Sequence, residues 1–129
     1  MNVAFFIIGF GDVGSNKLFP NLINVLQDGE KYPLLSNSGK FDIYIVDIKP
    51  FTELEKTINK FKGIEKIDIF YLNSSIKNEF EKLRTIPDEY DYVIVYISSP
   101  NKTHTKYIRL FLDTANRIFV EKPLSDYLE

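Results

Sequence analysis

Three glycines follow the apolar run Val3 to Ile8 with the spacing G-x-G-x-x-G, in the segment Gly9-Phe10-Gly11-Asp12-Val13-Gly14. Behind a strand, this spacing is typical of a turn whose backbone amides bind the pyrophosphate of a dinucleotide. Gly9 would allow the bend, Gly11 would let the phosphates approach, and Gly14 would let the next helix pack on the sheet. We therefore predict a dinucleotide site here, although a glycine-rich turn without a ligand would show the same spacing.

An acidic residue, Asp47, ends the second apolar run, Ile43 to Val46. A carboxylate at this place would accept hydrogen bonds from the hydroxyls of the adenosine ribose and would repel a 2′-phosphate. This favours NAD over NADP, although Lys49 could supply a compensating cation. The distance from the glycines exceeds the usual separation of about 20 residues, because a loop signal from Asp28 to Lys40 intervenes. Asp47 could instead cap the strand end or the turn at Lys49-Pro50.

A polar segment follows the fourth apolar run, Tyr92 to Ile97, and reads Ser98-Ser99-Pro100-Asn101-Lys102-Thr103-His104. It leads from a strand into a helix, with Asn101 or Thr103 as the predicted N-cap. We expect the backbone at Ser99, Pro100 and Asn101 to lie along the cofactor. Histidine titrates near neutrality and often serves as a base. The position of His104 in the first turn of a helix favours a structural or cofactor-edge role instead.

The candidate for chemistry is Lys122, in Glu121-Lys122-Pro123 directly after the fifth apolar run, Ile118 to Val120. If this strand neighbours the fourth, Lys122 reaches the crevice near the nicotinamide, with Glu121 beside the cofactor. Burial there would lower the lysine pKa. A protonated lysine could orient a substrate hydroxyl, and a neutral one could accept its proton. A surface lysine that merely precedes a proline is the alternative.

The elements that must position these residues alternate along the chain. Helical patterns separate the apolar runs, and several runs are nearly continuous in apolar character, as expected when helices cover both faces of a parallel sheet. We predict an α/β fold, a Rossmann-type doubly wound parallel sheet in a single domain. Thr52 and Glu55 suggest a capping box for the helix that follows the second run. Pro20 should kink the first helix or divide it into two segments.

The composition excludes several other functions. The chain has 129 residues, one domain's worth, and its 16 Lys and Arg against 18 Asp and Glu leave no basic surface for nucleic acid. Without cysteine and with one histidine, neither a disulfide nor a metal site is predicted. No apolar run approaches the roughly 18 residues of a membrane span. We expect a soluble, cytoplasmic protein.

Taken together, the segments Gly9 to Gly14, Pro100 to His104 and Glu121 to Pro123 resemble the N-terminal domain of the Gfo/Idh/MocA oxidoreductases over essentially the whole chain. The resemblance implies a Rossmann domain that binds NAD or NADP, with Lys122 contacting substrate and nicotinamide and a Lys122-Pro123 bond that is cis. It also implies a second domain with the substrate pocket and an oligomerisation sheet. Residues 11–22 are similar, in addition, to the opening of glucose-6-phosphate dehydrogenases.

We therefore predict a cofactor-binding domain over residues 1–123, with residues 124–129 beginning a linker or helix towards a substrate domain outside this chain. The full-length protein would be an NAD(P)-dependent oxidoreductase, and a homo-oligomer, that acts on a hydroxyl or ketone of a sugar, cyclitol or related polyol. This chain alone would bind cofactor with little turnover. The alternatives are a glucose-6-phosphate dehydrogenase-like domain and a non-catalytic module that senses a dinucleotide.

Overall fold

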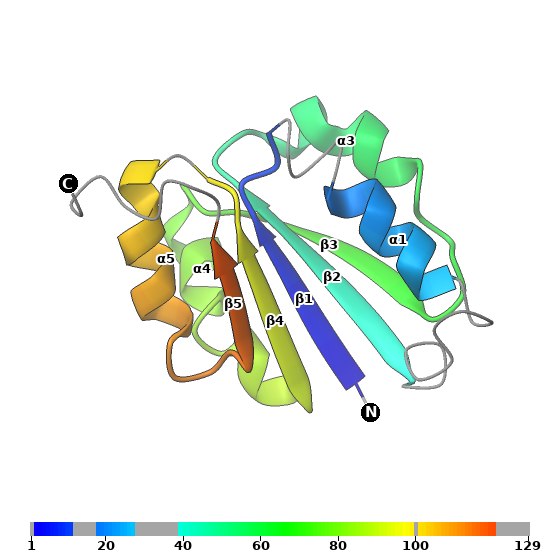
Figure 1. Cartoon of the computed structure of the whole chain (residues 1–129). Helices are drawn as coiled ribbons and strands as arrows, with labels where there is room; N and C mark the ends of the chain where they lie inside the picture. The colour runs from blue at the N-terminus through cyan, green and yellow to red at the C-terminus, as the bar shows by residue number, and fades with distance from the viewer. Residues whose placement is uncertain (1, 12–17, 28–38, 100, 121–129) are drawn as a thin grey trace.

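The computed structural model describes residues 2–11, 18–27, 39–99 and 101–120, and all structural statements concern these residues. They form a sheet of five parallel strands in the order β3-β2-β1-β4-β5 (Figure 1). The strands are β1 (Asn2–Ile8), β2 (Lys40–Asp47), β3 (Ile67–Asn73), β4 (Tyr92–Ile97) and β5 (Arg117–Val120). The four apolar runs named above lie within β1, β2, β4 and β5, and the α/β class and the Rossmann-type parallel sheet are confirmed.

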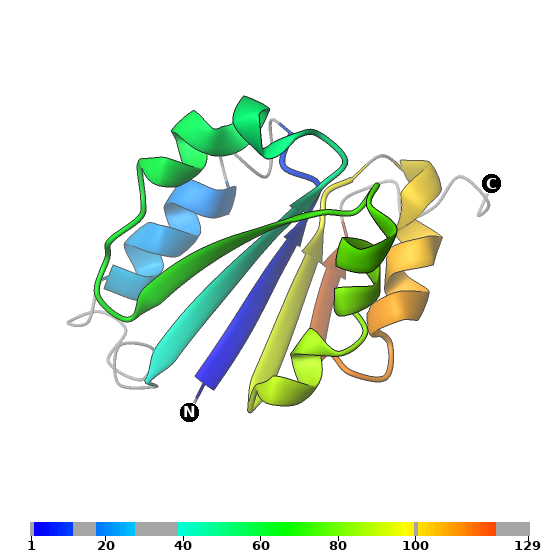
Figure 2. The ribbon, with the colours of Figure 1, turned by 180° about the vertical axis from the view of Figure 1, so that it is seen from behind.

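Two layers of helices cover the two faces of the sheet. On the front face of Figure 1 lie α1 (Phe19–Gln27) and α3 (Phe51–Asn59), packed over β1, β2 and β3. The back face, seen in Figure 2, carries α4 (Lys77–Lys82), the 3₁₀ helix η2 (Ile86–Glu89) and α5 (His104–Phe111), with the 3₁₀ helix η3 (Asn101–Thr103) leading into α5. The strands β1, β2 and β3 are added in order towards one edge of the sheet. After β3 the chain crosses back to the other side of β1, where β4 and then β5 are added, as in doubly wound folds.

The central strands owe their apolar character to this double cover. In β2, every residue after Lys40 is buried, and in β1 the side chains of Phe6, Ile7 and Ile8 are at most 1% exposed. Burying a side chain of this size stabilises the fold by about 1.5–3 kcal/mol. The sheet is thus a rigid base for the loops at the carboxyl ends of its strands.

The start of α3 differs from the prediction. Its N-cap is Pro50 and no side chain caps it, so Thr52 lies within the first turn and the predicted capping box is wrong. The proline, with φ −60°, directs the chain into the helix, and its carbonyl already accepts a 3.0 Å hydrogen bond from the amide of Glu53. The helix therefore begins before the sequence signal for a capping box. In α1, Pro20 is the second residue of the described helix.

The front face of β4 and β5 differs from the rest of the sheet, because no described helix packs over it (Figure 1). Tyr96 of β4 and Phe119 of β5 stack there, with ring centroids 6.5 Å apart. Phe119 is 52% exposed. Part of the sheet beside the carboxyl edge thus presents aromatic surface on this face.

Candidate functional site

Gly9 connects β1 to the glycine segment in a conformation that requires glycine. Its φ is +89°, and its amide donates a 2.7 Å hydrogen bond to the carbonyl of Val46. A Cβ at this position would lie 2.6 Å from both the backbone nitrogen and the Cα of Ser99. The turn after β1 is therefore pressed against the backbone after β4, and the predicted bend at Gly9 is confirmed.

Gly11 lies in a different environment, because a Cβ built on it would meet no atom of the described chain within 4 Å. As far as the described residues go, the space beside Gly11 at the carboxyl edge of the central strand is therefore open. This is the edge where parallel α/β sheets bind their ligands. A side chain at Gly11 would enter this space, and the contact of Gly11 with a pyrophosphate stays a prediction.

Asp47, the last residue of β2, holds the turn from the other side. One oxygen of its carboxylate accepts a 2.7 Å hydrogen bond from the amide of Phe10, and the other accepts a 3.0 Å bond from the amide of Lys49. Asp47 therefore caps the turn at Lys49, which was the alternative interpretation of this residue. Each carboxylate oxygen can accept a further hydrogen bond. The ribose contact accordingly stays a prediction.

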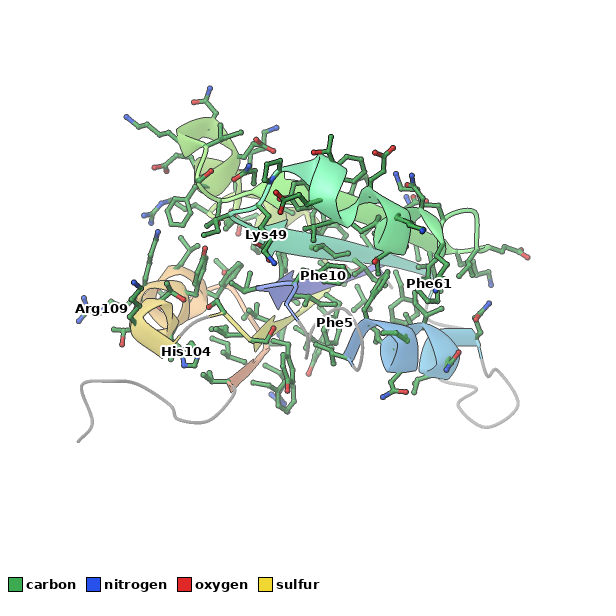
Figure 3. All side chains as sticks on the ribbon, turned by 90° about the horizontal axis from the view of Figure 1, so that it is seen from above. Phe5, Phe10, Lys49, Phe61, His104 and Arg109 are labelled. Carbon is green, nitrogen blue, oxygen red and sulfur yellow. The ribbon has the colours of Figure 1, made fainter. Side chains whose placement is uncertain are left out.

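Phe10 contributes its backbone to this edge, and its ring to the core. The side chain is 2% exposed and meets Phe19 of α1 edge-on, with ring centroids 5.4 Å apart. Its amide is directed at Asp47. The ring of Phe10 thus packs in the core, while its backbone joins the turn to Asp47. Figure 3, which looks down on this edge, shows Phe10 between Phe61 on one side and His104 on the other.

Of the two serines after β4, Ser98 binds the glycine turn and Ser99 binds the start of α5. The hydroxyl of Ser98 donates a 2.6 Å hydrogen bond to the carbonyl of Gly9, and its amide donates one of 2.8 Å to Ile8. The hydroxyl of Ser99 lies 2.6 Å from that of Thr103, the N-cap residue of α5. Ser99 therefore lies directly beside the glycine turn, and its predicted contact with the cofactor stays a prediction. Asn101 begins η3.

His104 is the first residue of α5 and is fully buried. Its Nε2 lies 2.8 Å from the carbonyl oxygen of Ser99. A carbonyl only accepts hydrogen bonds, so this Nε2 carries the proton and donates. The structural role predicted for the imidazole agrees with this position. A direct contact between the ring and a cofactor stays a prediction.

Two residues that the sequence analysis did not single out complete this edge. Ser74, one residue beyond β3, is buried and donates its amide to the carbonyl of Asp47 at 2.9 Å. Burial raises the pKa of Tyr107 in α5, and the nearby side chain of Ser74 acts in the opposite direction. The signal that the sequence offered for Ser74 was a serine directly after a strand. Tyr107 is 33 positions away along the chain, so no local pattern predicts the pair.

The segment after β2 is also held by a hydrogen bond from another strand. The hydroxyl of Tyr71 in β3 donates a hydrogen bond to the carbonyl of Lys49. Burial, followed by the charge of Asp47, raises the pKa of Tyr71 to about 12. Ile48, between Asp47 and Lys49, is 68% exposed. An apolar side chain is therefore presented to solvent next to the carboxylate predicted to bind ribose.

Several predicted site residues lie outside the described part of the chain. They are Asp12, Val13, Gly14, Pro100, Glu121 and Lys122. Their predicted roles therefore stay predictions. The structure does show that β5, after which Lys122 follows, pairs directly with β4. The prediction for Lys122 required the fifth strand to neighbour the fourth, and this pairing is present.

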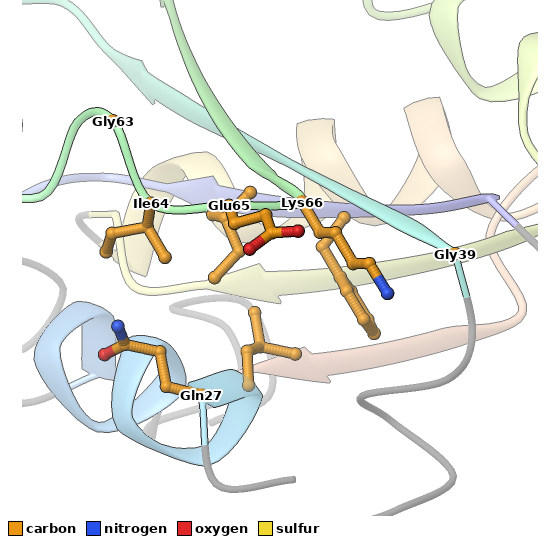
Figure 4. A pocket seen from close by; sticks show the side chains of 9 residues that line it. Gln27, Gly39, Gly63, Ile64, Glu65 and Lys66 are labelled. Carbon is orange, nitrogen blue, oxygen red and sulfur yellow. The ribbon is translucent and has the colours of Figure 1, made fainter.

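A separate cavity of about 570 Å³ opens at the amino-terminal edge of the sheet, opposite the glycine turn (Figure 4). Glu65 and Lys66 supply its charged side chains, and the rest of its lining is apolar, amide or glycine. The cavity lies far from Gly9 and Asp47 in the fold. We assign no chemistry to it.

Comparison with known proteins agrees with the fold and the edge described above. The family model GFO_IDH_MocA, described as an oxidoreductase family with an NAD-binding Rossmann fold, matches residues 3–129. The chain belongs to this family. The Gfo/Idh/MocA resemblance seen in the sequence is thereby confirmed, and with it an NAD-binding Rossmann domain from a family of oxidoreductases. The search of curated proteins gives no match.

Membership in the Gfo/Idh/MocA family supports the interpretation of the glycine turn as part of a dinucleotide site. The close approach of Gly9 to the backbone of Ser99 lies at the carboxyl edge of the sheet, the edge where parallel α/β sheets bind their ligands. Among the helices of the described residues, none is long and apolar enough to cross a membrane.

Proposed function

We propose that this chain binds NAD, in preference to NADP, across the carboxyl edge of its sheet, as the cofactor domain of an oxidoreductase that acts on a hydroxyl or ketone of a sugar, cyclitol or related polyol. The observation that carries the proposal is the open space at Gly11, beside a turn fixed on one side by Asp47 and on the other by Ser98 and Ser99. Preorganised turns of this kind are what dinucleotide phosphates require.

The topology indicates how the cofactor lies. The glycine turn follows the central strand β1, so the pyrophosphate belongs there, and Asp47 after β2 is placed to accept the ribose hydroxyls of the adenosine half. The nicotinamide half then extends to the β4 side, along Ser99, Pro100 and Asn101, with His104 behind Ser99 and Glu121 next to the cofactor. When bound, the nicotinamide supplies the hydride chemistry.

The role we propose for Lys122 is to orient the substrate at the β5 side of the nicotinamide. As a cation it would donate a hydrogen bond to the substrate hydroxyl or carbonyl, and as a neutral amine it would take the hydroxyl proton. The support for this is the pairing of β5 with β4, which brings the residues after Val120 to the same edge as Ser99.

The substrate pocket, in this proposal, comes from a second domain joined to residues 124–129. The stacked Tyr96 and Phe119, with Phe119 half exposed and no described helix over them, offer apolar surface beside the carboxyl edge. Exposed apolar patches often mark surfaces that bind other parts of an assembly. The assembled protein would be a cytoplasmic homo-oligomer.

The test is a pair of titrations of the chain with NAD⁺ and NADP⁺ by calorimetry. We expect saturable binding of both, with NAD⁺ the tighter ligand because the carboxylate of Asp47 repels a 2′-phosphate. Absence of binding by either would contradict the proposal. Turnover is then tested on the full-length protein with a panel of polyols, and binding without turnover of any would favour a sensing module over an enzyme.

A further inference from the structure

The buried side of α5 carries two polar side chains, His104 and Tyr107, where apolar residues would suffice for packing. They are 0% and 4% exposed, and each holds a different part of the carboxyl edge. His104 binds the carbonyl of Ser99 after β4, and Tyr107 binds Ser74 after β3. Burying a polar group costs free energy unless it is hydrogen-bonded. These two bonds therefore fix α5 to two loops at once.

We propose that His104 is a positioning residue for the nicotinamide half of the dinucleotide: its Nε2–H holds the Ser99 carbonyl and so fixes the backbone against which that half lies. The inference rests on the proposed function, since it concerns the same crevice. His104 itself, being fully buried, acts through Ser99.

The position of Ser99 leaves little room for adjustment. A Cβ built on Gly9 would lie 2.6 Å from both the Cα and the nitrogen of Ser99. The hydroxyl of the neighbouring Ser98 donates a 2.6 Å hydrogen bond to the carbonyl of Gly9. A shift of Ser99 by a few tenths of an ångström therefore alters the walls of the crevice on the β4 side. The hydrogen bond from His104 and the one between Ser99 and Thr103 together fix the position of the Ser99 backbone.

Topology separates the roles of the two side chains of α5. Ser99 follows β4, on the side of β1 that receives the nicotinamide half, whereas Ser74 follows β3 and donates to the carbonyl of Asp47, on the adenosine side. Loss of the His104 bond should thus weaken binding of the nicotinamide half more than binding of the adenosine half. Loss of the Tyr107 bond should disturb adenosine binding, which NAD and ADP-ribose share.

The experiment measures affinities of the chain for NAD⁺ and for ADP-ribose, which lacks the nicotinamide, in four variants. For His104→Leu we expect NAD⁺ to bind about five- to tenfold more weakly, the equivalent of one hydrogen bond, with a clearly smaller loss for ADP-ribose. His104→Gln should restore NAD⁺ binding, because a glutamine amide reaches the place of Nε2. His104→Asn should not, because its amide is shorter. Tyr107→Phe should weaken both ligands by the same factor.

Fluorescence of bound NADH gives a second readout, since its emission depends on the surroundings of the nicotinamide. We expect a changed emission in His104→Leu and His104→Asn, and the wild-type emission in His104→Gln and Tyr107→Phe. If His104→Leu does not fold, as judged by thermal melting, the comparison of Gln with Asn decides the question.

Equal losses for NAD⁺ and ADP-ribose in His104→Leu, or indistinguishable Gln and Asn variants, would overturn the inference while leaving the proposed function intact. If the wild-type chain binds neither ligand, the proposed function fails first and the inference falls with it. The two failures are therefore distinguishable.

Discussion

The carboxylate of Asp47 accepts a 2.7 Å hydrogen bond from the backbone amide of Phe10, a residue 37 positions earlier in the chain. This bond joins the end of β2 to the glycine turn after β1. Ser98 makes the matching connection from β4 to Gly9. Three strand ends therefore hold one another at the carboxyl edge of the sheet, and a ligand that binds there would meet a turn that is already ordered.

Replacing Asp47 with Ala tests its part in cofactor choice. We expect NAD⁺ affinity to fall by about tenfold, as loss of a charged hydrogen bond implies, and NADP⁺ affinity to fall less, because the repulsion of the 2′-phosphate is lost as well. The measurement is a titration with each dinucleotide. Asp68→Ala, which removes an exposed carboxylate from β3, is the control and should change neither affinity. Equal losses for the two cofactors in Asp47→Ala would contradict ribose recognition.

Gly9 and Gly63 allow backbone strain to be separated from steric clash. Both have positive φ, +89° and +85°, but a Cβ at Gly63 meets nothing within 4 Å, whereas one at Gly9 meets the backbone of Ser99 at 2.6 Å. Gly63→Ala should cost about 1–2 kcal/mol in unfolding free energy from the left-handed conformation. Gly9→Ala should cost a further 1–3 kcal/mol from overpacking. Urea unfolding measures both, and equal costs would show that the contact with Ser99 is not rigid.

A polar cluster on the back face gives a stability prediction away from the cofactor edge. The hydroxyl of Tyr90 donates to the buried carboxylate of Asp42 and lies 2.5 Å from the hydroxyl of Tyr44. Tyr90→Phe should destabilise the fold by about 1–3 kcal/mol, because a buried carboxylate oxygen loses its donor. Tyr44→Phe, which leaves the bond to Asp42 in place, should cost less. Urea unfolding of the two variants would contradict this assignment if Tyr44→Phe proved the more damaging.

Alkaline pH should weaken the fold through Tyr71. Burial, then the charges of Asp47, Glu79 and Glu53, raise its pKa from 10.0 to about 12 in the folded chain. Above pH 10 the unfolded chain loses this proton and the folded chain keeps it, so stability is complete below pH 10 and falls as the pH rises towards 12. In Tyr71→Phe this loss should be smaller. Unfolding free energies measured from pH 9 upwards give the comparison, and parallel curves for variant and wild type would refute the role of Tyr71.

The central strands were predictable because helices on both faces of the sheet bury nearly every residue, and β2 shows this most clearly. The glycine turn was predictable because positive φ and close backbone approach at Gly9 leave glycine as the one residue that fits. Such constraints act locally, so the residue types that satisfy them can be recognised within the element itself or directly next to it.

Long-range pairs were not predictable in the same way. Asp47 was assigned from its place after a strand, but its hydrogen bond to Phe10 depends on β2 lying beside β1. Ser74 and Tyr107 meet because α5 packs over the sheet behind both loops, and neither carries a motif. The capping box at Thr52 was wrong because Pro50 starts the helix earlier.

The central claim, that a dinucleotide lies against Gly11, is tested most directly by titrating NADH into the wild-type chain and into Gly11→Leu. The leucine Cβ has no neighbour within 4 Å, so the melting temperature should be retained while NADH affinity falls by tenfold or more, about 1.4 kcal/mol or above. A folded Gly11→Leu chain that binds NADH as tightly as the wild type would contradict the account.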